Sequence, residues 1–236
     1  MKLSNRLNHI IKMCNYSDVI IDVGCDHGYI SISLIQKNKC KKCYAVDINE
    51  GPLNNARSNI KLYKLENDIK CIQSDGFDFL NQNGNISAVI AGMGGVTIAN
   101  ILQQNKDKVN DMDYILIQPN SYPKDIRKFL YNNKIYIETE DVVFSEGVYY
   151  EYILIFPKRQ GVLTEEIQKF LLDFEYEIST CIMNNIDGKY NDFILYKIRK
   201  YTLILKELEK IRVKNYEKWN TFNNRILKLR EYLNDN

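Results

Sequence analysis

The residue types best suited to chemistry lie in residues 19–28, V-I-I-D-V-G-C-D-H-G. An apolar run bounded by glycines indicates a buried strand that runs into a tight turn. Gly24 and Gly28 have no Cβ, so the backbone can turn sharply there and a ligand can approach closely. A helical pattern follows from Tyr29 to Lys37. Strand, glycine turn and helix form the opening of a nucleotide-binding βαβ unit.

The charge of this turn limits the kinds of ligand that it can bind. A dinucleotide site has the pattern G-x-G-x-x-G, with the pyrophosphate on the helix N-terminus. Here the pattern is D-x-G-x-D-x-G, with Asp22 before the first glycine and Asp26 in place of the middle one. Two carboxylates repel a pyrophosphate but suit S-adenosylmethionine (SAM), which carries a sulfonium and an ammonium group. At this point a purely structural turn remains an equal alternative.

Further acidic residues follow the next predicted strands. Asp47 comes 23 residues after Gly24, where an acidic side chain holds the ribose hydroxyls of a nucleotide. Asp75 and Gly76 end the third strand, where a carboxylate can accept a hydrogen bond from an adenine amino group, and Gly92 ends the fourth. A single Asp after a strand is usually a helix cap, but three in succession predict an adenosyl ligand at the carboxyl ends of the strands.

The elements that must position these residues alternate between strand and helix. After the first strand, further strands are predicted at 42–48, 69–75, 86–92 and 113–119, with helices between them. Such alternation favours a parallel, doubly wound sheet. Residues 136–144 and 148–156 are β-rich and joined by S-E-G without a helix, which predicts a terminal hairpin. We therefore expect an α/β fold with the Rossmann-like seven-stranded sheet of class I methyltransferases, rather than a dehydrogenase.

The pattern changes after residue 157. Apolar residues recur every three to four positions over 163–182 and again over 194–233, with N-N-I-D-G between them. Two long helices joined by a glycine turn predict an antiparallel helical hairpin or coiled coil. Asn215 at a seam position would fix its register. We expect a methyltransferase domain at 1–157 and a helical domain at 158–236.

Net positive charge is concentrated in the helical domain. Residues 196–230 carry 11 Lys and Arg against three Asp and Glu, while residues 1–157 carry 17 against 18. Such a basic segment is either a solvated helix face or a surface that contacts RNA phosphates, and its contrast with a nearly neutral first domain favours RNA. Arg6 and Lys12 would add to this surface. The RNA-binding candidates are Lys197, Arg199, Lys200, Lys206, Lys210, Arg212, Lys214, Lys218, Arg225, Lys228 and Arg230.

Composition excludes other classes. The chain has 236 residues, 45% of them hydrophobic and 26% charged, which is typical of a globular protein. The sequence has no apolar run near the roughly 20 residues that span a bilayer, and its first residues are too polar for a signal peptide. We therefore expect a cytoplasmic protein without a membrane partner. Cys40 and Cys43 form a C-x-x-C pair without a second pair, so we expect no metal site.

Several short motifs together resemble one family. They are L-S-N-R-L at 3–7, D-V-G-C-D-H-G-Y at 22–29, V-D-I at 46–48, S-D-G at 74–76, A-G-M-G-G at 91–95 and Q-P-N at 118–120. In combination they resemble the bacterial tRNA (adenine-22-N1)-methyltransferase family over most of residues 3–157. The C-terminal helices are similar to the coiled-coil domain of that family.

The resemblance implies transfer of a methyl group from SAM to N1 of an adenine in tRNA, namely adenine 22, with S-adenosylhomocysteine as the product. Many adenine methyltransferases carry N-P-P-Y after the fourth strand, whereas this chain has G-M-G-G, so the base must be held differently. We carry over no base-stacking aromatic residue from those enzymes. The cofactor-binding candidates are Arg6, Asp22, Gly24, Asp26, His27, Asp47, Ile48, Asp75, Gly76, Gly92, Met93, Gly94 and Gly95.

The transfer itself needs mainly positioning, because adenine N1 attacks the methyl group with its lone pair and loses no proton first. Asp26 is a candidate for stabilising the cationic product or accepting from the N6 amino group, and Asn120 for reading the Watson–Crick edge. His27 is a candidate general base, and Tyr29 would line the pocket. The alternatives are structural: a turn carboxylate for Asp26, a loop cap for Asn120, a backbone donor for His27 and ordinary packing for Tyr29.

Rival functions remain open at this point. One is a SAM-dependent methyltransferase acting on another RNA or on a small molecule, and the basic segment argues against a small substrate. Another is a non-catalytic module that binds SAM or another nucleotide. An NAD-dependent oxidoreductase is disfavoured by the missing G-x-G-x-x-G and the terminal hairpin. A base in folded tRNA must leave its stack to reach a pocket. We expect a monomer, although a helical hairpin can also pair between two chains.

Overall fold

The computed structural model describes residues 3–81, 84–159, 164–184, 188–210 and 216–234. The chain separates into two compact units, Met1–Ile178 and Ser179–Asn236. The first compact unit is therefore longer than the methyltransferase domain expected from the sequence, which ended at residue 157.

Seven described strands form one mixed sheet in the order β3-β2-β1-β4-β5-β7-β6. The first five are parallel to one another, and β7 runs antiparallel to both β5 and β6. This confirms the predicted five parallel strands and terminal hairpin. The strands are β1 (Ser17–Val23), β2 (Cys40–Asp47), β3 (Ile69–Gln73), β4 (Ile86–Gly94), β5 (Ile115–Ser121), β6 (Ile137–Ser145) and β7 (Val148–Ile155).

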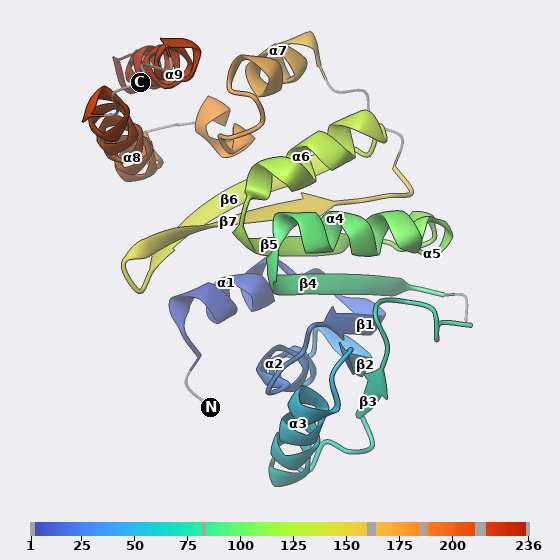
Figure 1. The fold of residues 1–236 in the computed structure, drawn as a ribbon. Coiled ribbons are helices and arrows are strands. Elements are labelled where there is room, and N and C mark those ends of the chain that lie inside the picture. The colour runs from blue at the N-terminus through green and yellow to red at the C-terminus, as the bar shows by residue number, and fades with distance from the viewer. Residues whose placement is uncertain (1–2, 82–83, 160–163, 185–187, 211–215, 235–236) are drawn as a thin grey trace. The chain divides into compact units, whose positions relative to one another are not determined.

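Helices cover both faces of the sheet (Figure 1). The helices α1 (Asn5–Met13), α2 (Tyr29–Gln36) and α3 (Glu50–Leu62) contribute to the apolar core on one face. The helices α4 (Gly95–Gln104), α5 (Lys106–Asn110) and α6 (Pro123–Asn132) contribute to the core on the other face. Ile20 and Ile21 are adjacent in β1 but belong to opposite cores, because successive side chains of a strand point to opposite faces. Both faces are covered, so the strands read as continuous apolar runs.

A buried ionic cluster ties the last part of the first unit to the sheet. Arg127 on α6 has no exposed surface, and its guanidinium lies against Glu140 of β6 (2.7 Å) and Glu151 of β7. The same guanidinium donates from Nη1 to the backbone oxygen of Tyr176 at 3.1 Å. Lys124 also pairs with Glu177. These contacts explain why the first unit continues through α7 (Glu165–Asp173) to Ile178.

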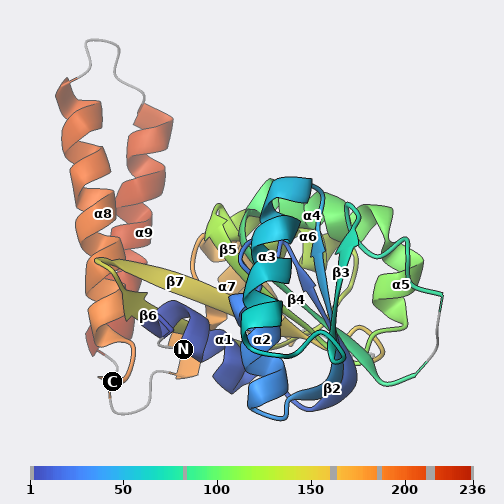
Figure 2. The same cartoon turned by 90° about the horizontal axis from the view of Figure 1, so that it is seen from below.

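The second unit contains a helical pair (Figure 2). Its helices are α8 (Asn191–Lys210) and α9 (Tyr216–Asn234), preceded by the 3₁₀ helix η1 (Thr180–Asn184). The rings of Tyr201 and Phe222 lie 5.3 Å apart, and Trp219 Nε1 donates to Glu209 Oε1 at 3.2 Å. Positions late in α8 thus meet positions early in α9, which is the pattern of an antiparallel pair.

The C-terminal part of the chain is helical, as predicted, but the predicted bounds of its helices are wrong. We expected one helix over 163–182 and one over 194–233, joined at N-N-I-D-G. Instead α7 ends at Asp173, and Glu175 and Tyr176 have left-handed backbone conformations, which a helix cannot continue through. The hairpin forms between α8 and α9, within the span expected to be a single helix. Asn215, proposed to fix register, lies outside the described residues.

The sequence also led to expectations about membrane-spanning segments, the C-x-x-C pair and metal sites. None of the helices in the described part of the chain is long and apolar enough to cross a membrane. Cys40 and Cys43 lie in β2 with buried side chains, and burial raises the pKa of the Cys43 thiol. Within the described ranges, no group of three or more His, Cys, Asp and Glu side chains is arranged to hold a metal ion.

Candidate functional site

The glycine turn after β1 has the backbone that its sequence predicted. Gly24, Asp26 and Gly28 all have positive φ, at 75°, 48° and 70°. Gly28 donates its N–H to the Cys25 oxygen at 2.7 Å, which closes the turn. A Cβ on Gly24 would overlap the side chain of Met93. The turn after β1 therefore packs directly against the end of β4, and its conformation requires glycine there.

Asp22 lies beneath this turn, and its contacts are internal. Its Oδ2 accepts hydrogen bonds from the Ser31 backbone N–H (3.0 Å) and the Ser31 hydroxyl (2.6 Å) at the start of α2. The side chain is buried, and burial raises its pKa to about 6, partly opposed by the two Ser31 hydrogen bonds. Its Oδ1 has no partner among the described residues. Asp22 thus joins β1 to α2 through one oxygen, while the other is buried as well, so contact of Asp22 with a cofactor stays a prediction.

The ends of β2 and β3 present the groups expected for an adenosyl ligand. Asp47 accepts from the Asn49 backbone N–H through Oδ1 at 2.9 Å, which turns the chain towards α3. The Ile48 side chain is 61% exposed, unusual for an aliphatic residue after a buried strand. Asp75 is exposed just after β3. The structure therefore brings these three residues to one edge of the sheet, and they fit a ribose and an adenine.

The ends of β4 and β5 are joined by hydrogen bonds. Arg6 of α1 donates from Nη1 to Gln118 Oε1 at 2.7 Å, and Gln118 Nε2 lies 3.3 Å from Asn120 Oδ1. Asn120 donates from Nδ2 to the backbone oxygen of Gly92 at 2.8 Å. Arg6 also lies over the ring of Tyr150, 5.6 Å from its centroid. We call Arg6, Gln118 and Asn120 the acceptor-side network.

This network changes how two of the predicted residues are understood. Asn120 uses its amide within the protein, so its reading of a base edge stays a prediction. Arg6 contacts Gln118 and Tyr150, so its binding of the cofactor stays a prediction. Sequence reasoning missed Gln118 as a site residue, although it is the first residue of Q-P-N and is fully buried. Its polarity in the middle of an apolar strand was the signal that could have identified it.

The glycines at the end of β4 and the start of α4 differ in what constrains them. Gly94 pairs with Ser121 across the sheet, and a Cβ on Gly95 would overlap the backbone oxygen of Tyr122. Gly92 has φ 84°, which favours glycine. The structure therefore gives Gly95 a packing role between β4 and β5, whereas Gly92 is exposed.

The remaining catalytic candidates lie on the turn after β1. The carboxylate of Asp26 is 69% exposed and lies 3.7 Å from His27 Nε2. The rings of His27 and Tyr29 stack with centroids 5.4 Å apart and planes inclined by 17°. Asn59 of α3 donates to the His27 backbone oxygen. These three side chains are accessible and adjacent, so their proposed contact with the reacting base remains compatible with the geometry.

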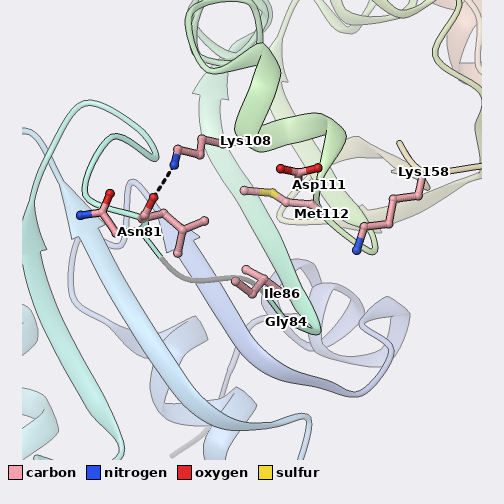
Figure 3. A pocket seen from close by; sticks show the side chains of 8 residues that line it. Asn81, Gly84, Ile86, Lys108, Asp111, Met112 and Lys158 are labelled. Carbon is pink, nitrogen blue, oxygen red and sulfur yellow. Dashed lines mark hydrogen bonds between the residues drawn. The ribbon is translucent and has the colours of Figure 1, made fainter.

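A separate pocket lies at the opposite edge of the sheet (Figure 3). It has a volume of about 430 Å³ and is lined near the start of β4 by Gly84 and Ile86. Lys108 donates to the Leu80 backbone oxygen, and Lys158 pairs with Asp113. None of the predicted site residues lines this pocket, and its two lysines already have partners in the protein.

The basic candidates of the second unit differ in their exposure. Lys197 and Arg225 are buried, with Lys197 over the Phe193 ring and Arg225 over the Phe222 ring. These two are therefore packing residues of the hairpin, and we correct their assignment as surface contacts. Arg212 and Lys214 lie outside the described residues. Lys228 is half-buried, and the exposed candidates are Arg199, Lys200, Lys206, Lys210, Lys218 and Arg230.

Comparison with known proteins gives a consistent result. A family model described as "Methyltransferase domain" matches residues 3–153. The chain is 30% identical over 154 residues to the tRNA (adenine(22)-N(1))-methyltransferase of Bacillus subtilis (strain 168), over 65% of each protein. It is 35% identical over 153 residues to a putative tRNA methyltransferase, MG248, of Mycoplasma genitalium, over 63% of this chain and 67% of that one. The aligned part thus spans slightly less than two thirds of the B. subtilis protein.

A solved structure extends the similarity to the helical unit. The structure of M. capricolum TrmK in complex with S-adenosyl-homocysteine superimposes with a TM-score of 0.80, at 31% identity and over 99% of both chains. Because the family model covers more than half of the chain and this structural relative covers nearly all of it, the chain belongs to the methyltransferase-domain family and, within it, to the family of M. capricolum TrmK.

Proposed function

We propose that this protein transfers a methyl group from SAM to N1 of an adenine in tRNA, namely adenine 22. The observation that carries the proposal is the match to M. capricolum TrmK over 99% of the chain, which includes the helical pair as well as the catalytic unit. That relative is solved with S-adenosyl-homocysteine, the demethylated form of SAM. The proposal therefore covers the cofactor and the substrate together.

The geometry of the first unit supports binding of SAM. Asp47 offers a carboxylate for ribose hydroxyls, and the exposed Ile48 offers an apolar surface for a purine. Asp75 lies at the next strand end, where its carboxylate can accept from the adenine amino group. The accessible carboxylate of Asp26 lies on the turn after β1. Negative charge along this edge suits the cationic sulfonium and ammonium groups of SAM and disfavours a dinucleotide pyrophosphate.

The chemistry assigned to the chain's own residues is mainly positioning. SAM supplies an electrophilic methyl group, and adenine N1 has a lone pair ready to accept it. The acceptor-side network holds the ends of β4 and β5 at a fixed separation, which sets where a base can be placed. Asp26 stabilises the positive charge that develops on the methylated adenine. No residue needs to remove a proton before the attack, so His27 acts as a positioning residue rather than as a general base.

Binding of tRNA is proposed for the second unit. The exposed cations Arg199, Lys200 and Lys206 all belong to α8, and Arg and Lys side chains supply most of the affinity for nucleic acids by neutralising phosphates. We further propose that the protein acts as a monomer in the cytoplasm, where its tRNA substrate is found.

The decisive experiment is a methyl-transfer assay with labelled SAM on an unmodified tRNA transcript, followed by nucleoside analysis. We expect N1-methyladenosine in the wild-type transcript and none in a matched transcript with guanine at position 22. Methylation of both transcripts would move the target to another adenine. Absence of N1-methyladenosine would contradict the proposal, and SAM binding without any transfer would favour a non-catalytic module.

A further inference from the structure

The backbone at Tyr122 is unusual for its place in the fold. Several non-glycine residues have positive φ, and Asn38, Lys64 and Lys134 among them come just after helices, where left-handed residues commonly end a helix. Asp26 and Tyr122 instead lie between the carboxyl end of a strand and the next helix. Both therefore lie at the edge of the sheet that carries the candidate site.

The conformation of Tyr122 has an energetic cost and is held by its neighbours. Its φ and ψ are both 52°, a left-handed conformation that is unfavourable for a non-glycine residue. Its backbone oxygen packs so closely on Gly95 that a Cβ there would overlap it. The same oxygen accepts from the Asp125 N–H at 3.0 Å in the first turn of α6. Two neighbouring elements thus keep Tyr122 in this conformation.

The side chain of Tyr122 is left in solvent by this arrangement. It is 64% exposed, although an aromatic ring gains free energy by burial. Ser121 pairs with Gly94, so Tyr122 comes directly after the residues that join β4 and β5. The cofactor candidates lie on α1, at the ends of β1 to β4 and at the start of α4, and none of them belongs to β5, which leaves the end of β5 for the second substrate.

We propose that Tyr122 is the aromatic surface on which the target adenine stacks after it leaves the tRNA helix. The inference rests on the proposed function and adds the residue that holds the base. An extruded base loses its stacking partners and regains them on an aromatic side chain. A constrained backbone limits the positions open to the ring and so lowers the entropy lost on binding. It also supplies an aromatic surface to an enzyme that has G-M-G-G in place of N-P-P-Y after β4.

Three variants of the full chain test this inference. Tyr122→Asn removes the ring while asparagine tolerates the left-handed backbone, and Tyr122→Phe keeps the ring without the hydroxyl. Tyr16→Ala is the matched control, because Tyr16 is 51% exposed just before β1, at the other edge of the sheet. The measurements are kcat/KM with tRNA, the dissociation constant of SAM by calorimetry, and thermal stability.

We expect Tyr122→Asn to lower kcat/KM by about 5- to 150-fold, the range that corresponds to loss of one base–aromatic stack. We expect Tyr122→Phe and Tyr16→Ala to stay within about twofold of wild type, with SAM affinity unchanged in all three, because only the ring contacts the base. Full activity of Tyr122→Asn, or an equal loss in Tyr122→Phe, would overturn the stacking role of Tyr122 and leave the proposed function unaffected. A wild-type protein that forms no N1-methyladenosine on tRNA would instead contradict the proposed function and this inference with it.

Discussion

The carboxyl edge of the sheet and the α8–α9 hairpin hold their polar side chains in different ways. At the sheet edge, Asp47 and Asp75 come just where their strands end, on the same side of the molecule. In the hairpin, Lys197 and Lys200 are three residues apart in one helix, yet one is buried and the other exposed. In a parallel sheet the carboxyl ends of the strands lie at one edge. The exposure of a residue in a helix depends instead on what packs against it.

The largest expected effect concerns the buried carboxylate at the sheet edge. The pKa of Asp22 is about 6 in the folded protein, against an ordinary value of 3.8, mainly because of burial. Between these pH values the folded state binds more protons than the unfolded state, so the free energy of unfolding falls as pH rises. The full difference corresponds to about 3 kcal/mol. Asp22→Asn should lack this dependence.

The measurement is urea denaturation of both proteins from pH 4 to pH 7. The stability of Asp22→Asn should increase relative to wild type across this interval. Parallel stability curves for the two proteins would show that folding leaves the pKa of Asp22 unchanged.

The next effect concerns the exposed cations of the hairpin. Replacing Arg199, Lys200 and Lys206 together by alanine should weaken tRNA binding by about 100-fold at 0.1 M salt and lower the salt slope by about 2 to 3, because three phosphate contacts are lost. Filter binding over a salt series measures both quantities. The matched control replaces Lys37, Lys61 and Lys64, which are exposed in the first unit. Equal binding by the two triple variants would indicate that α8 presents only a solvated face.

A smaller effect is expected at the cofactor side of the sheet edge. Asp47→Ala should weaken SAM binding by about 30-fold, because hydrogen bonds from hydroxyl groups to a carboxylate contribute about 2 kcal/mol. Affinity for tRNA should not change. Calorimetry with SAM measures the first quantity, and Asp18→Ala serves as the control, because Asp18 lies near the start of β1 and pairs with Lys41. Unchanged SAM affinity in Asp47→Ala would move the ribose site elsewhere.

The smallest effect is expected on the acceptor side. Gln118→Ala removes the link between Arg6 and Asn120, so the ends of β4 and β5 lose part of their support. We expect kcat/KM with tRNA to fall about tenfold, since an unsatisfied buried partner costs about 1–3 kcal/mol. SAM affinity should stay within twofold of wild type. A larger loss in SAM affinity than in transfer would assign the network to the cofactor rather than to the acceptor.

Local signals predicted the strand ends well and the helices less well. Each strand end is marked by a few neighbouring residues, such as the apolar run and glycines around Asp22, so the pattern needs no distant partner. Apolar periodicity continues from α8 into α9, because both helices present apolar residues to each other. That periodicity indicates helix but does not report where the chain reverses, which is why a single helix over 194–233 was expected.

By itself, the sequence determined the alternation of strands and helices as far as the terminal hairpin, the turn after β1 and the place of Asp47 and Asp75, because these depend on residues close together in the chain. Only the tertiary structure decided that one oxygen of Asp22 binds Ser31, that Arg6 reaches Gln118 across 112 positions, and that Lys197 is buried while Lys200 is exposed. Each of these depends on contacts formed only when distant segments pack, so no local pattern encodes them.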